Sequence, residues 1–355
     1  MSEAVRDEAT LRKVLRSRIS ETDAVVEAFK LAGRSGSLAL GAAVVLGALA
    51  GVGEWMSSQA ALEVKEWEVG TLTTAWQLGA AIAFFLVLYA VIQFTKRETA
   101  SIESWLPALF ALPVLCVTGG LAGANGSTIP ITDVLFFNAF TIVFTMVAAA
   151  PAVILWVRAG QAAAKDEEHD LGETLLAIRE QYQQVMVIRG AKFQAILVGA
   201  QVVLPGIFYA LQLAFAEIIA VLQPERSALQ RSGNLSWGIR GRLFRLLALM
   251  IIPSNVLVVG ALVTLRLATG ADGSASEQAS AVFQAWVFNP GVLGISGLVV
   301  QDVILTVAWW ITLLAVLVLF NEREGQIQAK RELKRLLAAQ KEAKEPAAES
   351  DASPA

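Results

Sequence analysis

The chain has 355 residues, of which 55% are apolar and 17% are charged, and its mean hydropathy is +0.58. Ordinary globular proteins contain about 25% charged residues. Here the apolar residues form blocks of about 20 residues or more, the length that crosses a bilayer. This composition excludes a soluble protein and predicts an all-α, polytopic helical membrane protein. A formal net charge of −3 with no basic face excludes nucleic acid as a partner.

Residues 1–35 are polar, and apolar positions between 8 and 31 repeat with helical spacing, which predicts a cytoplasmic amphipathic helix. This segment lacks the apolar stretch of a signal peptide, so we expect it to be retained. The apolar blocks that follow predict a transmembrane helical domain over 36–320. Its elements are expected at about 36–55, 74–95, 104–123, 132–157, 193–222, 246–268 and 292–320.

The distribution of lysine and arginine predicts the topology. Of the 28 basic residues, 26 lie in five segments, which are 1–35, 95–104, 158–192, 223–245 and 321–355. Cytoplasmic loops carry an excess of these residues, so both termini and three loops are expected in the cytoplasm. The abundance of alanine and glycine favours a bacterial source, and we expect the cytoplasmic (inner) membrane of a bacterium.

The block 193–222 departs from this pattern because both of its flanks are basic. A single helix of that length would measure about 45 Å, against about 30 Å of hydrocarbon. Pro205 and Gly206 interrupt the block near its middle. We therefore predict a re-entrant or shallow helical hairpin that turns at Pro205 and Gly206, together with six full transmembrane spans. One long helix is the alternative.

Three further segments are expected outside the membrane. Residues 165–190 have the composition of a second cytoplasmic helix, and residues 321–345 extend the last span as a charged cytoplasmic helix. The tail 346–355 is expected to be disordered, because it is polar and contains too few apolar residues to pack.

Three ionisable residues, Glu217, Asp302 and Arg266, fall inside predicted spans. Such groups are rare at membrane depth and suggest a function by default. Asp302 is interpreted either as a proton or cation site or as the partner of Arg266 in a structural ion pair. Glu217 is expected to pair with Arg226 or Arg231 near the membrane surface, or else to belong to a transport site.

The segment 223–245 is basic, contains glycine and precedes a predicted span. Such segments attract anionic lipid headgroups, although they also occur simply as topology signals. The candidate contacts for a lipid headgroup or a protein partner are Arg226, Arg231, Ser232, Arg240 and Arg242.

Gly47 and Gly51 form a GxxxG pattern in the first span, which permits close helix packing within one chain or between chains. The only histidine, His169, lies in an acidic run and is interpreted as part of a solvated helix start. The only cysteine, Cys116, is interpreted as a packing residue. A chain with one cysteine and one histidine offers no disulfide and no multi-histidine centre, so we expect no metal and no cofactor.

A set of short motifs carries a family resemblance. Between 204 and 253 the chain has a Pro-broken apolar segment and an Ala-Leu-x-Arg-Ser run, followed by a Leu-x-x-Gly pair. The last span ends in Phe-Asn-Glu-Arg-Glu-Gly. The motif residues are Ala228, Leu229, Arg231, Ser232, Leu235, Gly238, Phe320, Asn321, Glu322, Arg323, Glu324 and Gly325.

These motifs resemble a family of bacterial integral membrane proteins that includes the membrane domain of some glycerophosphoryl diester phosphodiesterases and stand-alone, uncharacterised members. The resemblance covers about 190–325 and implies a membrane fold. It does not imply the phosphodiesterase activity, because the chain has neither the extra length nor the histidines of that metal-dependent barrel. Gln223 and Asn321 stand where the family commonly has acids.

These observations predict a non-enzymatic membrane subunit that interacts with lipids, including anionic headgroups, or with a protein partner through its cytoplasmic termini. The alternative is a small-molecule or ion transporter or channel that uses Glu217 and Asp302, because broken helices often build carrier sites. A membrane enzyme acting on a lipid substrate is the third reading. It would need a cluster of polar residues at one depth.

Overall fold

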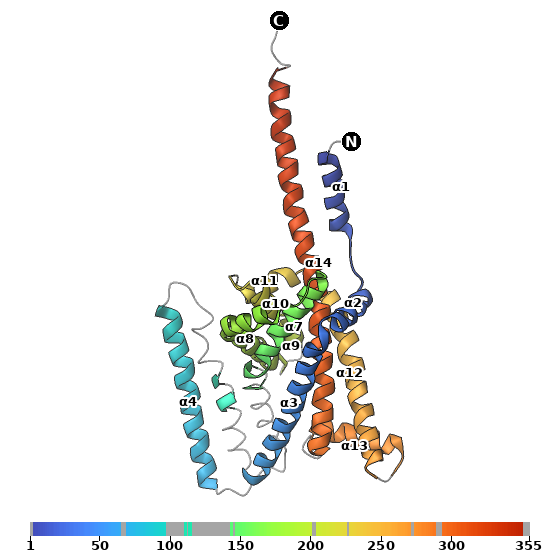
Figure 1. Cartoon of the computed structure of the whole chain (residues 1–355). Helices are drawn as coiled ribbons and strands as arrows, with labels where there is room; N and C mark the ends of the chain where they lie inside the picture. The colour runs from blue at the N-terminus through green and yellow to red at the C-terminus, as the bar shows by residue number, and fades with distance from the viewer. Residues whose placement is uncertain are drawn as a thin grey trace.

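The computed structural model describes residues 3–64, 69–96, 110–111, 113–115, 143–144, 146–200, 204–225, 227–270, 273–288 and 293–350. Over these residues the protein is all-α, as the composition predicts, and contains twelve helices (Figure 1). They are α1 Glu3–Arg16, α2 Glu21–Arg34, α3 Gly36–Val64, α4 Val69–Lys96, α7 Ala149–Ala164, α8 Leu171–Ala200, α9 Leu204–Gln212, α10 Ala216–Leu222, α11 Ala228–Ser236, α12 Arg240–Ala268, α13 Ala275–Phe288 and α14 Gly294–Ser350.

Three of these helices are long and apolar enough to cross a membrane, which indicates a membrane protein. They cover Gly36–Gln59 in α3, Arg240–Ala268 in α12 and Gly294–Ala339 in α14. Shorter apolar stretches cover Gln77–Ala90 in α4 and Gly206–Leu222 in α9 and α10. Most of the predicted span 104–123 and the first part of the predicted span 132–157 lie outside the described residues. The end of the latter span falls in α7.

The N-terminal segment forms two helices, where the sequence predicts one amphipathic helix within 1–35. The break falls between Arg16 and Glu21, because Ser20 has extended backbone angles and its hydroxyl accepts a hydrogen bond from Asp23 N at 3.0 Å. A serine followed three residues later by an acid is a helix-start signal. The polar run around it therefore divides the predicted helix.

The helix α8 joins two elements that the sequence predicts separately, the cytoplasmic helix 165–190 and the first arm of the hairpin. It runs without interruption from Leu171 to Ala200. Gly190 lies within this helix, and a side chain there would meet Met146, whose Cε lies 2.7 Å from an ideal Cβ. Glycine at this position thus allows close packing inside a continuous helix.

The chain doubles back after α8, and both α9 and α10 pack against it. Pro205 and Gly206 lie inside the first turn of α9, not between two helices. Proline is tolerated in a first turn, because the N–H it lacks would have no partner there. The break that the structure describes comes later, over residues 213–215, between α9 and α10.

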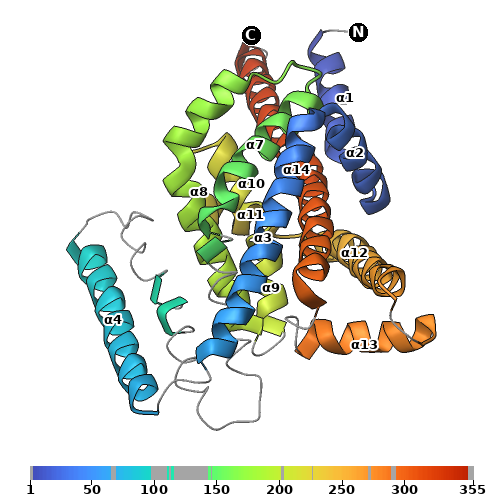
Figure 2. The ribbon, with the colours of Figure 1, turned by 60° about the horizontal axis from the view of Figure 1, so that its bottom comes forward.

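The centre of the molecule is the crossing of α3 and α14, which lie side by side (Figures 1 and 2). An ideal Cβ at Gly47 would lie 2.6 Å from the carbonyl oxygen of Asp302, and one at Gly51 would lie 2.6 Å from Val299 Cα. The GxxxG pattern is therefore used within the chain. Because later residues of α3 meet earlier residues of α14, the two helices are antiparallel.

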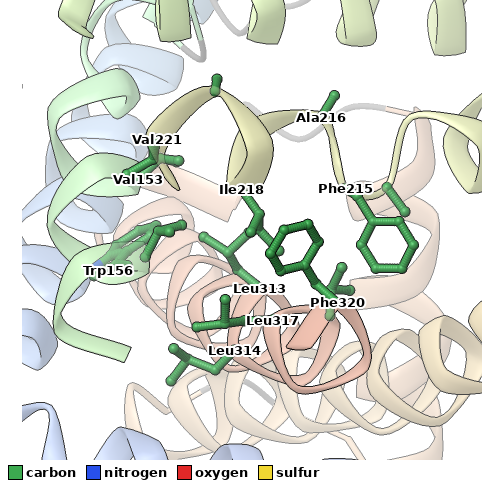
Figure 3. Packing of buried hydrophobic residues seen from close by; sticks show 14 of the residues in the cluster. Val153, Trp156, Phe215, Ala216, Ile218, Val221, Leu313, Leu314, Leu317 and Phe320 are labelled. Atoms are coloured by element: carbon green, nitrogen blue, oxygen red, sulfur yellow. The ribbon is translucent and has the colours of Figure 1, made fainter. Parts of the chain in front are cut away.

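A hydrophobic core joins α7, α10 and α14 (Figure 3). Trp156 of α7 is fully buried beside Trp309, with ring centroids 5.0 Å apart, and its Nε1 donates to Ala39 O of α3 at 3.0 Å. About three helical turns further along α14, Phe320 packs against Phe215 at 5.9 Å between centroids. This packing fixes the positions of α7, α10 and α14 relative to one another.

The helix α14 continues beyond the last predicted span as one element of 57 residues. Its charged part passes through the predicted segment 321–345 and ends at Ser350, so residues 346–350 are helical where a disordered tail was predicted. Alanine and glutamate in this stretch are strong helix formers. The N-terminal helix α1 lies beside this distal part, and both termini lie at the same end of the molecule (Figure 1).

Candidate functional site

A cavity of about 350 Å³ lies among α3, α8, α10 and α14. Most of its wall is apolar, and five charged side chains line it. The charged residues are Glu54, Arg189, Lys192, Glu217 and Asp302, and the other lining residues are Leu46, Ala50, Phe144, Ala149, Phe193, Leu305, Thr306 and Trp309. Two of the ionisable residues that the sequence singles out, Glu217 and Asp302, are therefore brought to one cavity.

Glu217 is fully enclosed and is neutralised by two cations of α8. Its Oε1 accepts a hydrogen bond from Arg189 Nη1 at 2.6 Å, and its Oε2 accepts one from Lys192 Nζ at 3.0 Å. The Arg189 guanidinium also stacks over the Trp309 ring at 4.4 Å. The predicted pairing of Glu217 with Arg226 or Arg231 is thus replaced by a buried cluster that ties α10 to α8 and α14.

Asp302 is also buried, with 6% of its surface exposed. Its Oδ1 accepts a long hydrogen bond of 3.5 Å from Gln301 Nε2, and its Oδ2 has no hydrogen-bond partner among the described residues. Glu54 of α3 is near enough to interact with it electrostatically. The predicted ion pair with Arg266 is not present. Arg266 lies in the last turn of α12, whereas the hydrogen bond of Asp302 among the described residues is with Gln301.

The two acids of this part of the cavity come together because α3 and α14 cross closely. Glu54 follows Gly47 by two helical turns, so the glycine face of α3 also presents Glu54. Side chains lean toward the N-terminus of their own helix. In an antiparallel pair, Glu54 and Asp302 therefore lean toward each other.

The predicted lipid or partner contacts of the basic segment are largely used inside the protein. Arg231 pairs with Glu324. Arg242 donates to both carboxylate oxygens of Glu322, at 3.0 and 2.9 Å, and also to Ile19 O. These bonds fasten the start of α12 and the helix α11 to α14 where it leaves the apolar region. Arg226 lies outside the described residues.

Arg240 and Ser232 also differ from the prediction of a lipid or partner contact. The Arg240 guanidinium is placed over the rings of Phe208 and Trp237, at 4.3 and 4.7 Å from their centroids. Ser232 is completely buried, and its hydroxyl donates to Gln212 O at 2.8 Å while accepting from Phe215 N at 3.1 Å. It satisfies backbone groups that the break between α9 and α10 leaves free.

The helix α2 is held against α12 by Glu21. Its Oε1 accepts hydrogen bonds from Arg245 Nη2 at 2.6 Å and from Nε at 3.1 Å. These bonds lower the pKa of Glu21 below its ordinary value of 4.5, so the carboxylate is ionised at neutral pH. The contact connects the N-terminal helices to the same ionic region that holds α14.

His169 and Cys116 add nothing to this site. The His169 ring lies 2.9 Å from the Thr174 hydroxyl, and Asp170 caps the start of α8 by accepting from Gly172 N at 2.7 Å. Cys116 lies outside the described residues. Within the described part of the chain, no group of three or more His, Cys, Asp or Glu residues could hold a metal ion.

No known protein family, curated protein or solved structure matches this chain. Sequence reasoning missed three of the cavity residues, Glu54, Arg189 and Lys192. The spacing of Glu54 from Gly47 and Gly51, on one helical face, is the signal that could have identified it.

Proposed function

We propose that this protein is a carrier that binds a small charged solute in a cavity within its transmembrane domain. The observation that carries this proposal is the enclosure of Glu217, Asp302, Arg189 and Lys192 around one space between candidate spans. Ionisable groups at membrane depth mark solute or ion pathways. Such a site recognises charge, and its apolar walls can contact the uncharged part of a solute.

The proposed topology is six spans and the hairpin formed by the end of α8 with α9 and α10, in the inner membrane of a bacterium. Both termini lie at one end of the molecule, which agrees with an even number of crossings (Figure 1). The positions of the lysines and arginines support a cytoplasmic location for that end. We also propose kinship with the membrane-domain family named above, on the motifs between 204 and 325.

The lipid-interacting alternative receives less support from the geometry. Arg231 and Arg242 are paired with acids of α14, Arg240 is stacked on aromatic rings, and Ser232 is buried. An arginine that already holds a carboxylate would have to release it before taking a phosphate headgroup. The cavity residue Asp302, by contrast, has an oxygen that the described residues leave without a partner.

Chemical labelling of the cavity tests the proposal. We expect a cysteine introduced by Thr306→Cys, in a Cys116→Ser background, to react with a water-soluble methanethiosulfonate reagent in intact membranes. The reason is that a cavity open to solute admits water, and only a hydrated thiol ionises to the reactive thiolate. The rate should exceed that of a lipid-facing thiol by roughly tenfold or more.

The matched control is Val256→Cys in the same background. Val256 is on the outer face of α12, with 67% of its surface exposed. Equal, slow labelling of Thr306→Cys and Val256→Cys would contradict a solute-accessible cavity and with it the carrier proposal.

A second candidate, binding of a protein partner, is favoured by one observation. The helix α1 and the distal part of α14 project together beyond the helical body (Figure 1). Gln326 Nε2 of α14 donates at 2.9 Å to the carbonyl oxygen of Ser17, the residue that follows α1. A groove lined by Leu11 and Leu336 lies between the two helices. Such a helical pair offers a surface for docking.

Mass spectrometry of the protein extracted in native lipid particles distinguishes the two candidates. A partner-binding subunit should retain a stoichiometric protein, and removal of residues 1–16 should release it while the helical body stays folded. The carrier should retain no such protein. Retention that is unchanged after the deletion would rule out this helical pair as the docking surface.

A further inference from the structure

We propose that Asp302, together with Glu54, forms a cation site that takes either a proton or the ammonium group of a small organic cation. This inference rests on the carrier function proposed above and names its solute. The two states exclude each other, because one carboxyl group holds either the proton or the ammonium ion.

The unpartnered oxygen of Asp302 is the first observation. This side chain is 6% exposed, lines the cavity, and keeps Oδ2 without a hydrogen-bond partner among the described residues. An ionised carboxylate is very costly to bury when nothing compensates its charge. The Asp302 carboxylate is therefore stable in this position only when it binds a proton or another positive charge.

Among the described residues, no cation forms a hydrogen bond with Asp302 Oδ2. From α8, Arg189 and Lys192 face the cavity, but both are bound to Glu217 of α10. From α3, Glu54 adds a second acid that interacts with Asp302. From α12, no ion pair reaches Asp302. The cavity therefore has an ion-paired cluster at α8 and α10, and Asp302 lies beside Glu54 between α3 and α14.

The size and lining of the cavity favour an organic cation over a metal ion. Its volume of about 350 Å³ is far more than one ion fills, since even a water molecule occupies only about 30 Å³. Leu46, Ala50 and Leu305 present apolar surface next to the acids. No group of three metal-ligating side chains occurs in the ranges that the structure describes.

When the neutral Asp302 carboxyl group binds an ammonium cation, its proton leaves to water, and the carboxylate forms an ion pair with the cation. When the cation leaves, a proton returns to the carboxylate. Total charge in the site is conserved at each step, so the entry of one cation is linked to the exit of one proton. This linkage would couple solute movement to a proton gradient.

The test uses the full chain in lipid nanodiscs, with tetraethylammonium chloride as the probe and sodium chloride at equal ionic strength as the comparison. We expect tetraethylammonium to raise the melting temperature of the wild type and to bind more weakly at pH 6 than at pH 8. It should also release protons into a weakly buffered solution that contains a pH-sensitive dye. Affinity should fall by about tenfold or more in Asp302→Asn.

Two further variants keep the test decisive. Asp302→Glu keeps the charge and should recover part of the affinity, whereas Glu180→Gln, at an exposed position on α8, should bind like the wild type. An equal response of the wild type and Asp302→Asn would overturn the proposal. An equal response to sodium chloride would overturn the assignment to an organic cation.

The failure of this inference is distinguishable from the failure of the carrier proposal. If Thr306→Cys is labelled and tetraethylammonium neither slows the labelling nor shifts melting, the cavity is open and only the cation site is wrong. If Thr306→Cys is not labelled, the carrier proposal itself fails.

Discussion

Replacing Glu217 with leucine should lower the free energy of unfolding by about 3–5 kcal/mol. The change leaves the Arg189 guanidinium buried without its carboxylate, and a buried unpaired charge is among the most destabilising defects in a protein. The loss of Glu217 costs less free energy at Lys192, because 21% of the Lys192 side chain is exposed and its ammonium group can reach water. Chemical denaturation of the protein in mixed micelles measures the loss.

Two further variants serve as controls for the Glu217→Leu prediction. Glu27→Leu breaks a surface pair with Lys30, in which both side chains are well exposed, and should cost no more than about 1 kcal/mol. The double change Glu217→Leu with Arg189→Met should recover most of the stability, because it removes both buried charges. If the double variant is as unstable as Glu217→Leu, the ion pair is not the cause of the defect.

Alanine at Gly47 or Gly51 should separate α3 from α14 and destabilise the protein by about 1–3 kcal/mol at each position. The added Cβ would lie 2.6 Å from backbone atoms of α14, which cannot move aside as a flexible side chain can. Labelling of Thr306→Cys should change as well, because this crossing forms one wall of the cavity.

The control for these variants is Gly41→Ala in the same helix, where an added Cβ meets nothing within 4 Å. There the substitution should be neutral or should stabilise the helix by up to about 1 kcal/mol, since alanine is the better helix former. Opposite signs at Gly41 and Gly51 would show that close packing, not helix propensity, explains the glycine pattern. The same sign at both would contradict this account.

The sequence was sufficient to predict the all-α class and the positions of α3, α12 and α14, because long apolar runs have few other solutions. It was less informative at helix ends, where local capping decides. Ser20 and Asp23 divide the N-terminal helix through a pattern that is visible in the sequence. The continuity of α8 through Gly190 is not visible there, and neither is the long-range packing of Met146 against this glycine.

The candidate site was predicted only in part. Hydropathy singled out Glu217 and Asp302 because charges stand out in apolar blocks, but it gave no information on their partners. Arg189 lies within the predicted cytoplasmic helix 165–190, so its burial against Glu217 depends on how α8 and α10 fold together. The pairing of arginines 231 and 242 with acids of α14 is equally a matter of long-range contact.

The uninterrupted course of α14 has a mechanical consequence. At 1.5 Å per residue the helix is about 85 Å long, and about 70 Å separate Asp302 from its C-terminal end. If it turns as a rigid rod about the level of the cavity, a tilt of about 5° moves that end by about 6 Å. A small tilt of α14 caused by occupation of the cavity would then produce a larger displacement at the C-terminal end of the helix. The salt bridges of Glu322 with Arg242 and of Glu324 with Arg231 hold α14 between the cavity and this end, and they would oppose such a tilt.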